Sequence, residues 1–246
     1  MYQVLVDAQT GEPLYRRGLT EHISDATYNV YTSDSPSPFS PGHSAPSAVQ
    51  PPLIPRVLVT TNAVSVIASP DGWINDGDNE TKGNNVLAHL DRNDDDQPDL
   101  PRPQGNPSRV FNFPVDLTQE PTTYGEAAVV NLFYWNNWIH DKLYHLGFTE
   151  AAGNFQVNNF GRGGLGNDPV LADAQDGLSL NDPFHVNNAN MATPPDGFSA
   201  RMQMYTWSGP TPDRDGYFDN EVIIHEYVHG LSNRRVGGGA GIRAMQ

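Results

Sequence analysis

Two segments of the chain place apolar residues at the spacing of an amphipathic helix. In the first, residues 121–146, apolar side chains recur every three or four positions and would form one buried stripe. The stripe consists of Ala128, Leu132, Trp135, Ile139, Leu143 and Leu146. Thr122 or Thr123 can cap the start of this helix, and Gly147 can end it. A structural role is expected for the two histidines of the segment, His140 and His145.

The second helical segment begins near Asp219, a residue type that caps helix N-termini well. Residues 222–224 are apolar and would anchor the helix in the core. Arg234 and Arg235 fall in its last turn, where positive charge suits the helix dipole. The glycines at 237–239 would end it, so the pattern predicts a second helix near the end of the chain.

Shorter apolar segments predict strands. Residues 2–19 have the pattern of a hairpin with its turn at 7–12, and residues 57–66 could form one strand. Three more strand-like segments lie at 154–158, 169–171 and 201–205. Residues 32–56 are rich in Ser and Pro, which predicts a linker or an extended surface strap. With 37% hydrophobic residues, 23 Gly and 21 Pro, the chain should be rich in loops around a modest core.

Acidic residues outnumber basic ones by 29 to 14, which gives a net charge of −15. A field of that sign repels nucleic acid and anionic membranes and suits a soluble, often extracellular protein. The chain contains no cysteine, so any zinc must be held by His and carboxylates. No apolar run is long enough to cross a membrane, and the start lacks a signal peptide. The protein is therefore cytoplasmic, or the chain begins downstream of the true start.

The acidic segment 91–99 has the alternating oxygen ligands of a calcium loop. Asp91, Asn93 and Asp95 alternate along it, and Asp99 follows. The segment lacks the Gly and the distal Glu of an EF-hand, so both a solvated acidic loop and a Ca²⁺ site remain open. Ca²⁺ is therefore a second candidate cofactor beside zinc.

The most specific chemistry lies in residues 223–230, Ile-Ile-His-Glu-Tyr-Val-His-Gly. His225 and His229 are four positions apart, and on a helix this spacing stacks both imidazoles on one face. Two neutral imidazoles so placed can share one Zn²⁺, and the adjacent Glu226 can take a proton from the water that zinc activates. The alternative is an amphipathic helix that carries two histidines by chance.

Zinc peptidases with this motif differ in their third ligand. In metzincins a Gly and a third His follow at fixed spacing, but those positions hold Ser232 and Arg235 here. The other large class uses a Glu on a later helix. The chain resembles one family of that class, the fungalysin metallopeptidases, which are relatives of thermolysin. The matching blocks keep the family's order at 122–124, 146–150, 152–156, 166–168, 174–177, 187–190, 201–205 and 225–234.

The resemblance implies the family's two-part zincin fold, which is α+β. The chain would hold the N-terminal β-rich half and the zinc-motif helix, and the C-terminal helical half would be missing. Residues 1–20 resemble the end of the family's propeptide, and residues 21–69 would form the mature N-terminal segment with the Ser/Pro-rich linker. Residues 70–246 would form an incomplete catalytic domain. Members of the family are secreted, so we expect an extracellular protein.

By the same resemblance, the chain is a zinc endopeptidase that hydrolyses proteins or peptides. His225 and His229 would ligate Zn²⁺, and Glu226 would act as the general base. Asn188 and Ala189 would lie on an edge strand that binds the substrate backbone by strand addition, although an ordinary Asn-rich turn is the alternative. The protein's own propeptide would be a further partner. We expect a monomer that binds neither nucleic acid nor membrane.

The family's third zinc ligand is a Glu in a later Gly-Glu-Gly-Trp-type motif. None of the residues after His229 is Glu, Asp, His or Cys, so we expect this ligand outside the chain. Two rival hypotheses follow. One is a catalytically dead fragment or pseudoenzyme, and the other is an acidic calcium-binding extracellular module whose zinc motif is incidental.

Overall fold

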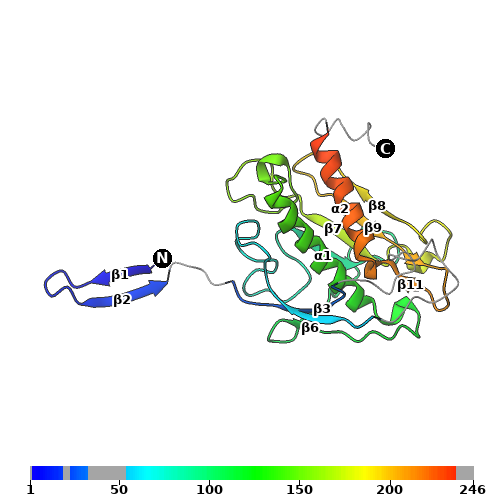
Figure 1. Cartoon of the computed structure of the whole chain (residues 1–246), viewed down its shortest axis with the longest axis horizontal. Helices are drawn as coiled ribbons and strands as arrows, with labels where there is room; N and C mark the ends of the chain where they lie inside the picture. The colour runs from blue at the N-terminus through cyan, green and yellow to red at the C-terminus, as the bar shows by residue number, and fades with distance from the viewer. Residues whose placement is uncertain (1, 19–22, 33–53, 237–246) are drawn as a thin grey trace.

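The computed structural model describes residues 2–18, 23–32 and 54–236 of the chain (Figure 1). These residues form two α-helices, four 3₁₀ turns and eleven strands in four small sheets. The organisation is therefore mixed α and β, in line with the expected α+β class. The glycines predicted to end the second helix, 237–239, lie outside the described residues, as does most of the Ser/Pro-rich segment.

The largest sheet has four strands in the order β5-β7-β9-β8. Three of them run parallel, and β8 pairs antiparallel with β9 at the edge. Their bounds are Val86–Leu90 for β5, Val170–Ala174 for β7, Ala189–Ala192 for β8 and Arg201–Met204 for β9. Parallel strands are usually covered by helices, and here α1 (Gly125–His145) packs against β5 and β7. β7 and β9 confirm the strands predicted near 169–171 and 201–205.

Helix α1 is buried around much of its circumference, which requires partners for its polar side chains. The amides of Asn136 and Asn137 donate to the carbonyls four residues earlier, at 3.0 and 2.9 Å. His140 is buried, with its Nδ1 3.0 Å from Oδ1 of Asp141. His145 is 2.8 Å from Oγ of Ser65. Both histidines thus make the kind of contact that a structural role requires.

The ends of α1 differ from the prediction in two ways. Residues 121–123 form a 3₁₀ turn, η1 (Pro121–Thr123), and the N-cap of α1 is Tyr124, with no side-chain cap. The expected cap at Thr122 or Thr123 is wrong because the Thr123 hydroxyl donates to the Glu120 carbonyl instead. Leu146 was expected in the buried stripe, but it follows the helix and is 82% exposed. Gly147 ends the helix as predicted, at φ +100°.

The remaining strands form three smaller sheets. β3 (Thr27–Val30) pairs with both β4 (Val57–Thr60) and β6 (Val110–Phe111), and β10 (Thr206–Trp207) pairs with β11 (Arg214–Asp215). β4 covers only the first part of the strand predicted at 57–66. The strand predicted at 154–158 is absent: the backbone of residues 156 and 157 bonds to the backbone of residues 84, 167 and 168, which lie in loops and not in a strand.

The N-terminal hairpin is confirmed. β1 (Tyr2–Val6) pairs antiparallel with β2 (Pro13–Gly18), and the turn lies between them. Asp7 shapes this turn because its Oδ1 accepts from the backbone N–H groups of Gln9 and Thr10, at 2.7 and 2.9 Å. Figure 1 draws the hairpin apart from the other elements. It keeps four apolar side chains exposed: Val4, Leu5, Val6 and Leu14.

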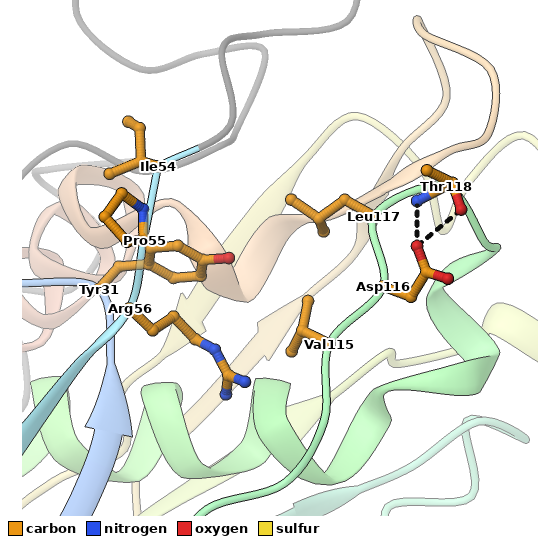
Figure 2. A pocket seen from close by; sticks show the side chains of 8 residues that line it. All are labelled: Tyr31, Ile54, Pro55, Arg56, Val115, Asp116, Leu117 and Thr118. Atoms are coloured by element: carbon orange, nitrogen blue, oxygen red, sulfur yellow. Dashed lines mark hydrogen bonds between the residues drawn. The ribbon is translucent and has the colours of Figure 1, made fainter.

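A pocket lies where the ends of β3 and β4 meet the loop 115–118 (Figure 2). The Arg56 guanidinium reaches across it and donates to the carbonyls of Asn29 and Phe113, at 3.3 and 2.7 Å. Asp116 is turned to the Thr118 backbone N–H, 2.9 Å away. The charged side chains that line this pocket are thus bonded within the protein.

Neither described helix has the length and apolar character needed to cross a membrane.

Candidate metal centre

Helix α2 (Asn220–Arg235) carries the His-Glu-x-x-His motif, and its N-terminus is fixed to α1. Asp219 caps it as predicted: its Oδ1 accepts from the Val222 N–H at 3.3 Å. The side chain of Asn220 donates to the Tyr31 carbonyl and accepts from Asn131 of α1, both at 3.0 Å. These buried bonds set where the helix begins relative to the core.

The C-terminal end of α2 is held by Arg234. Its buried guanidinium donates to Asp168 Oδ2 at 3.0 Å and to the Phe198 carbonyl at 2.9 Å. A further ion pair, 3.2 Å long, joins it to Asp196. The sequence predicted only a helix-dipole role for Arg234, because its partners come from distant loops. Exposed Arg235 fits that simpler expectation.

The middle of α2 packs closely on the sheet. Tyr227 is buried against Phe155, with ring centroids 5.6 Å apart. A Cβ at Gly230 would lie 2.9 Å from Met191 Cε on β8, so the helix approaches β8 closely at this glycine. Ile223 is fully buried, whereas the neighbouring residues 222 and 224 are only partly buried. The helix is therefore held against β8 over the motif.

His225 and His229 lie on the exposed side of α2 and face each other. Their Nε2 atoms are 2.9 Å apart, and the two rings stand at 84°. Zn–N bonds of about 2.0–2.1 Å in tetrahedral geometry place two nitrogens about 3.3 Å apart, close to this separation. The two nitrogens and a carboxylate oxygen of Glu226 all lie within 4.8 Å of one another. Two imidazoles beside a carboxylate form a donor set that fits zinc.

Glu226 is the buried member of this group, with 6% of its surface exposed. Burial raises the pKa of Glu226 above its ordinary value, and the nearby His229 and His225 partly offset that rise. A carboxylate with a raised pKa is a stronger base than one in water. Its position beside both imidazoles therefore suits proton transfer at the place where an ion would sit.

Strand β8 lies directly across from the motif. Asn188 is exposed just before the strand, and Ala189 is its first residue. Both line two adjoining hollows together with His225 and Glu226, and His229 borders the second hollow. Within the described sheet β8 has a neighbour on one side only. The structure thus brings all five residues predicted for the site to one cleft between α2 and an edge strand.

The residues predicted for calcium do not converge on one point. Asp91 accepts from the N–H groups of Asp95 and Asp96, at 3.2 and 2.9 Å, and Asp99 accepts from the Arg92 N–H at 3.0 Å. The carboxylates thus shape the loop. Two other groups do converge, Asp91 with Asp96 and Asp173, and Asp94 with Asp176 and His185. The sequence missed them because residues 173–185 lie far along the chain from the loop.

Comparison with known proteins gives consistent matches. The family model described as fungalysin metallopeptidase (M36) matches residues 43–246. An extracellular metalloproteinase of Pyrenophora tritici-repentis is 42% identical over 241 residues, which cover 96% of this chain and 33% of that protein. Extracellular metalloproteinases of Pyricularia oryzae and Aspergillus flavus are each 40% identical, over 95% and 98% of the chain. The chain spans about a third of the length of these relatives.

Proposed function

The chain belongs to the fungalysin family of zinc metallopeptidases, and we propose that the intact protein is a secreted zinc endopeptidase that cleaves proteins or peptides. One observation carries the proposal: two imidazole nitrogens 2.9 Å apart lie beside a buried carboxylate in a cleft bordered by an edge strand. Relatives named as extracellular metalloproteinases support the secreted location.

His225 and His229 would hold the zinc ion through Nε2. When bound, zinc supplies a Lewis acid that polarises the scissile carbonyl and lowers the pKa of water. The family's third protein ligand, a Glu, has no counterpart among residues 230–246, which hold no Glu, Asp, His or Cys.

Glu226 would act as the general base. Its carboxylate would accept a proton from the attacking water and then deliver that proton to the leaving amine. Burial raises the pKa of Glu226, which strengthens the base and makes the protonated form easier to hold between the two transfers.

The substrate backbone would add to β8 as a further strand. Ala189 begins this edge strand and Asn188 precedes it, so an extended peptide bonded there would run past Glu226 in the same cleft. Main-chain bonds of this kind favour endopeptidase activity on unfolded or extended segments, because they require no particular side chain.

The other predictions from the sequence stay proposals. Residues 1–20 would be the end of a propeptide, 21–69 the start of the mature chain and 70–246 part of the catalytic domain. The exposed apolar side chains of the hairpin fit a segment that docks elsewhere. Ca²⁺ at 91–99 and a monomeric state also remain predictions. Casein hydrolysis by the intact protein tests the pseudoenzyme hypothesis.

In the intact protein, Glu226→Gln should reduce peptide hydrolysis by about 10²–10⁴-fold, because an amide cannot accept the proton. Zinc content should not change. The matched control is Glu126→Gln, the same change at an exposed position in the first turn of α1. Casein hydrolysis and zinc analysis measure both effects. An inactive parent protein would support the pseudoenzyme, and near-normal cleavage by Glu226→Gln would refute the assigned base.

A further inference from the structure

A second group of potential ligands lies away from the zinc motif. Asp94 comes from the loop after β5, Asp176 from the turn after β7 and His185 from the loop before β8. One ligand atom from each lies within 4.8 Å of the other two. The three segments are far apart in sequence, so it is the fold that brings these side chains together.

Asp176 has a buried oxygen without a partner. Its carboxylate is fully buried, and Oδ2 accepts from Gln203 at 3.0 Å. Oδ1 has no hydrogen-bond donor among the described residues. Burial raises the pKa of Asp176 to about 8, and the negative charges of Asp173 and Asp94 add to the rise. A buried carboxylate in such surroundings is unfavourable unless a positive charge compensates it.

His185 has the orientation of a metal ligand. Its Nδ1 lies 2.9 Å from Oδ1 of Asp182. The pKa of Asp182 is lowered, chiefly by the hydrogen bond from the Phe184 backbone N–H. Asp182 is therefore ionised and accepts a hydrogen bond from Nδ1 of His185. Nε2 of the ring lies 3.2 Å from Oδ2 of Asp94. A carboxylate behind the other ring nitrogen is the usual arrangement for metal-ligating histidines.

The ring of His185 is also held in place by packing. Gly177, at φ +64°, lies against the ring so closely that a Cβ there would clash with it. Tyr205 also packs against it, with the two rings at 87° and their centroids 5.3 Å apart. Rigid support of this kind keeps Nε2 directed at the two carboxylates without further ordering on binding.

The neighbouring acidic group is different because it already has a cation. Asp91, Asp96 and Asp173 converge in a similar way. However, the Arg201 guanidinium pairs with Asp173 and lies 3.2 Å from Asp96. Among the described residues, no Arg or Lys pairs with Asp94 or Asp176. Of the two acidic groups, the one that contains His185 has no Arg or Lys partner among the residues that the structure describes.

We propose that Asp94, Asp176 and His185 bind a second divalent cation, of the class that takes imidazole and carboxylate ligands together, such as Zn²⁺ or Mn²⁺. Two carboxylates and a neutral imidazole carry the charge that balances such an ion. The ion would connect the loop 91–99 to the segment 182–188, which leads directly into β8. The bound ion would therefore stabilise the entry to the edge strand at the cleft.

The test uses the intact protein with His225→Ala and His229→Ala, so that the zinc motif cannot bind. In this background, calorimetric titration should show one site for Zn²⁺ or Mn²⁺, and the ion should raise the melting temperature. Asp94→Asn should weaken binding by at least about tenfold, since even supporting residues of metal sites have effects of that size. Asn tolerates the left-handed backbone at this position, where φ is +53°.

The matched control is Asp95→Asn, which removes the same charge one residue away, outside the group. It should leave the affinity unchanged. Equal losses of affinity in both variants would show that the general negative charge of the loop, and not a ligand at Asp94, attracts the ion. Absence of binding at millimolar Zn²⁺, Mn²⁺ and Ca²⁺ would refute the site. Binding of Ca²⁺ alone would refute the imidazole ligand. Because the zinc motif is removed in every sample, the result does not depend on the proposed peptidase activity.

Discussion

Asp141 and Asp176 are both fully buried carboxylates, but their surroundings shift their pKa values in opposite directions. Around Asp141, burial alone would raise the pKa. The hydrogen bonds and charge around it outweigh that effect, with His140 first among them, and the pKa falls below its ordinary value. Its two oxygens also accept from Val64 N, Ser65 N, Ser69 Oγ and Trp73 Nε1, at 2.6–3.0 Å.

Asp176 has the opposite environment. It has one hydrogen-bond donor among the described residues, Gln203, and the charges that raise its pKa are carboxylates, Asp173 and Asp94 first among them. Asp141 thus ties α1 to the segment 64–73 as part of the folded core, whereas the ionised form of Asp176 has no Arg or Lys partner among the described residues. Burial by itself does not reveal the role of an acidic residue. The number of donors directed at its oxygens separates a structural carboxylate from one that fits a cation.

The largest effect is expected at Asp141. Asp141→Asn removes a buried charge from several donors and should lower the free energy of unfolding by about 3–5 kcal/mol, as for other broken buried pairs. Asp71→Asn is the control, because Asp71 is exposed in the same region, and its effect should stay within about 0.5 kcal/mol. Urea denaturation measures both. A loss below 1 kcal/mol at Asp141 would remove the contrast between the two carboxylates.

The pH dependence of this variant has a defined sign. Because the folded-state pKa of Asp141 lies below its ordinary value of 3.8, its stabilisation is complete above that value. The stabilisation is lost as pH falls through the folded-state pKa. The stability difference between the parent and Asp141→Asn should therefore shrink below about pH 4. A difference that grows on acidification would mean that the pKa is raised instead.

Asp219 gives an intermediate case, because its carboxylate caps α2 with the Val222 N–H. Asp219→Ala should cost about 1 kcal/mol of stability, the usual value of an N-cap. Asp219→Asn retains the accepting oxygen and should cost much less. Thermal unfolding monitored by circular dichroism distinguishes the two variants. Equal losses would show that the charge of Asp219, rather than its capping bond, is what the fold requires.

Local patterns predicted the elements that depend on local interactions. The period of apolar residues located both helices, and Asp219 marked the start of α2. The same logic failed at Leu146, which fits the stripe by spacing but follows the last residue of α1 and has no neighbour to cover it. It also failed at 154–158, where the backbone bonds to loop residues instead of a neighbouring strand.

The candidate site, too, was predictable from the sequence only where its residues lie close together along the chain. His225, Glu226 and His229 are close in sequence, so helical spacing was enough to group them. Asn188 and Ala189 reached the site only through resemblance to a family, since no local pattern places β8 opposite α2. The group with Asp176 depends on contacts between three distant segments. The sequence indicated an acidic loop at 91–99 but could not show which carboxylates point out of it.

The smallest effect is expected at Asp176, and it is the sharpest test of the comparison. With EDTA present, Asp176→Asn should change the free energy of unfolding by less than about 0.5 kcal/mol, or raise it. The amide oxygen can still accept from Gln203, and the repulsion from Asp173 and Asp94 is relieved. The His225→Ala, His229→Ala background keeps the zinc motif out of the measurement.

The ion should then reverse this result. At a Zn²⁺ concentration of about one hundred times Kd, an ion that binds only the folded state adds about 2.7 kcal/mol to the parent, and Asp176→Asn should gain little of it. Urea denaturation of the parent and of Asp176→Asn, each with and without the ion, measures the four free energies of unfolding. A large loss in EDTA, similar to that of Asp141→Asn, would show that donors already satisfy Asp176. The two carboxylates would then play the same structural role, because each would owe its stability to hydrogen bonds rather than to a cation.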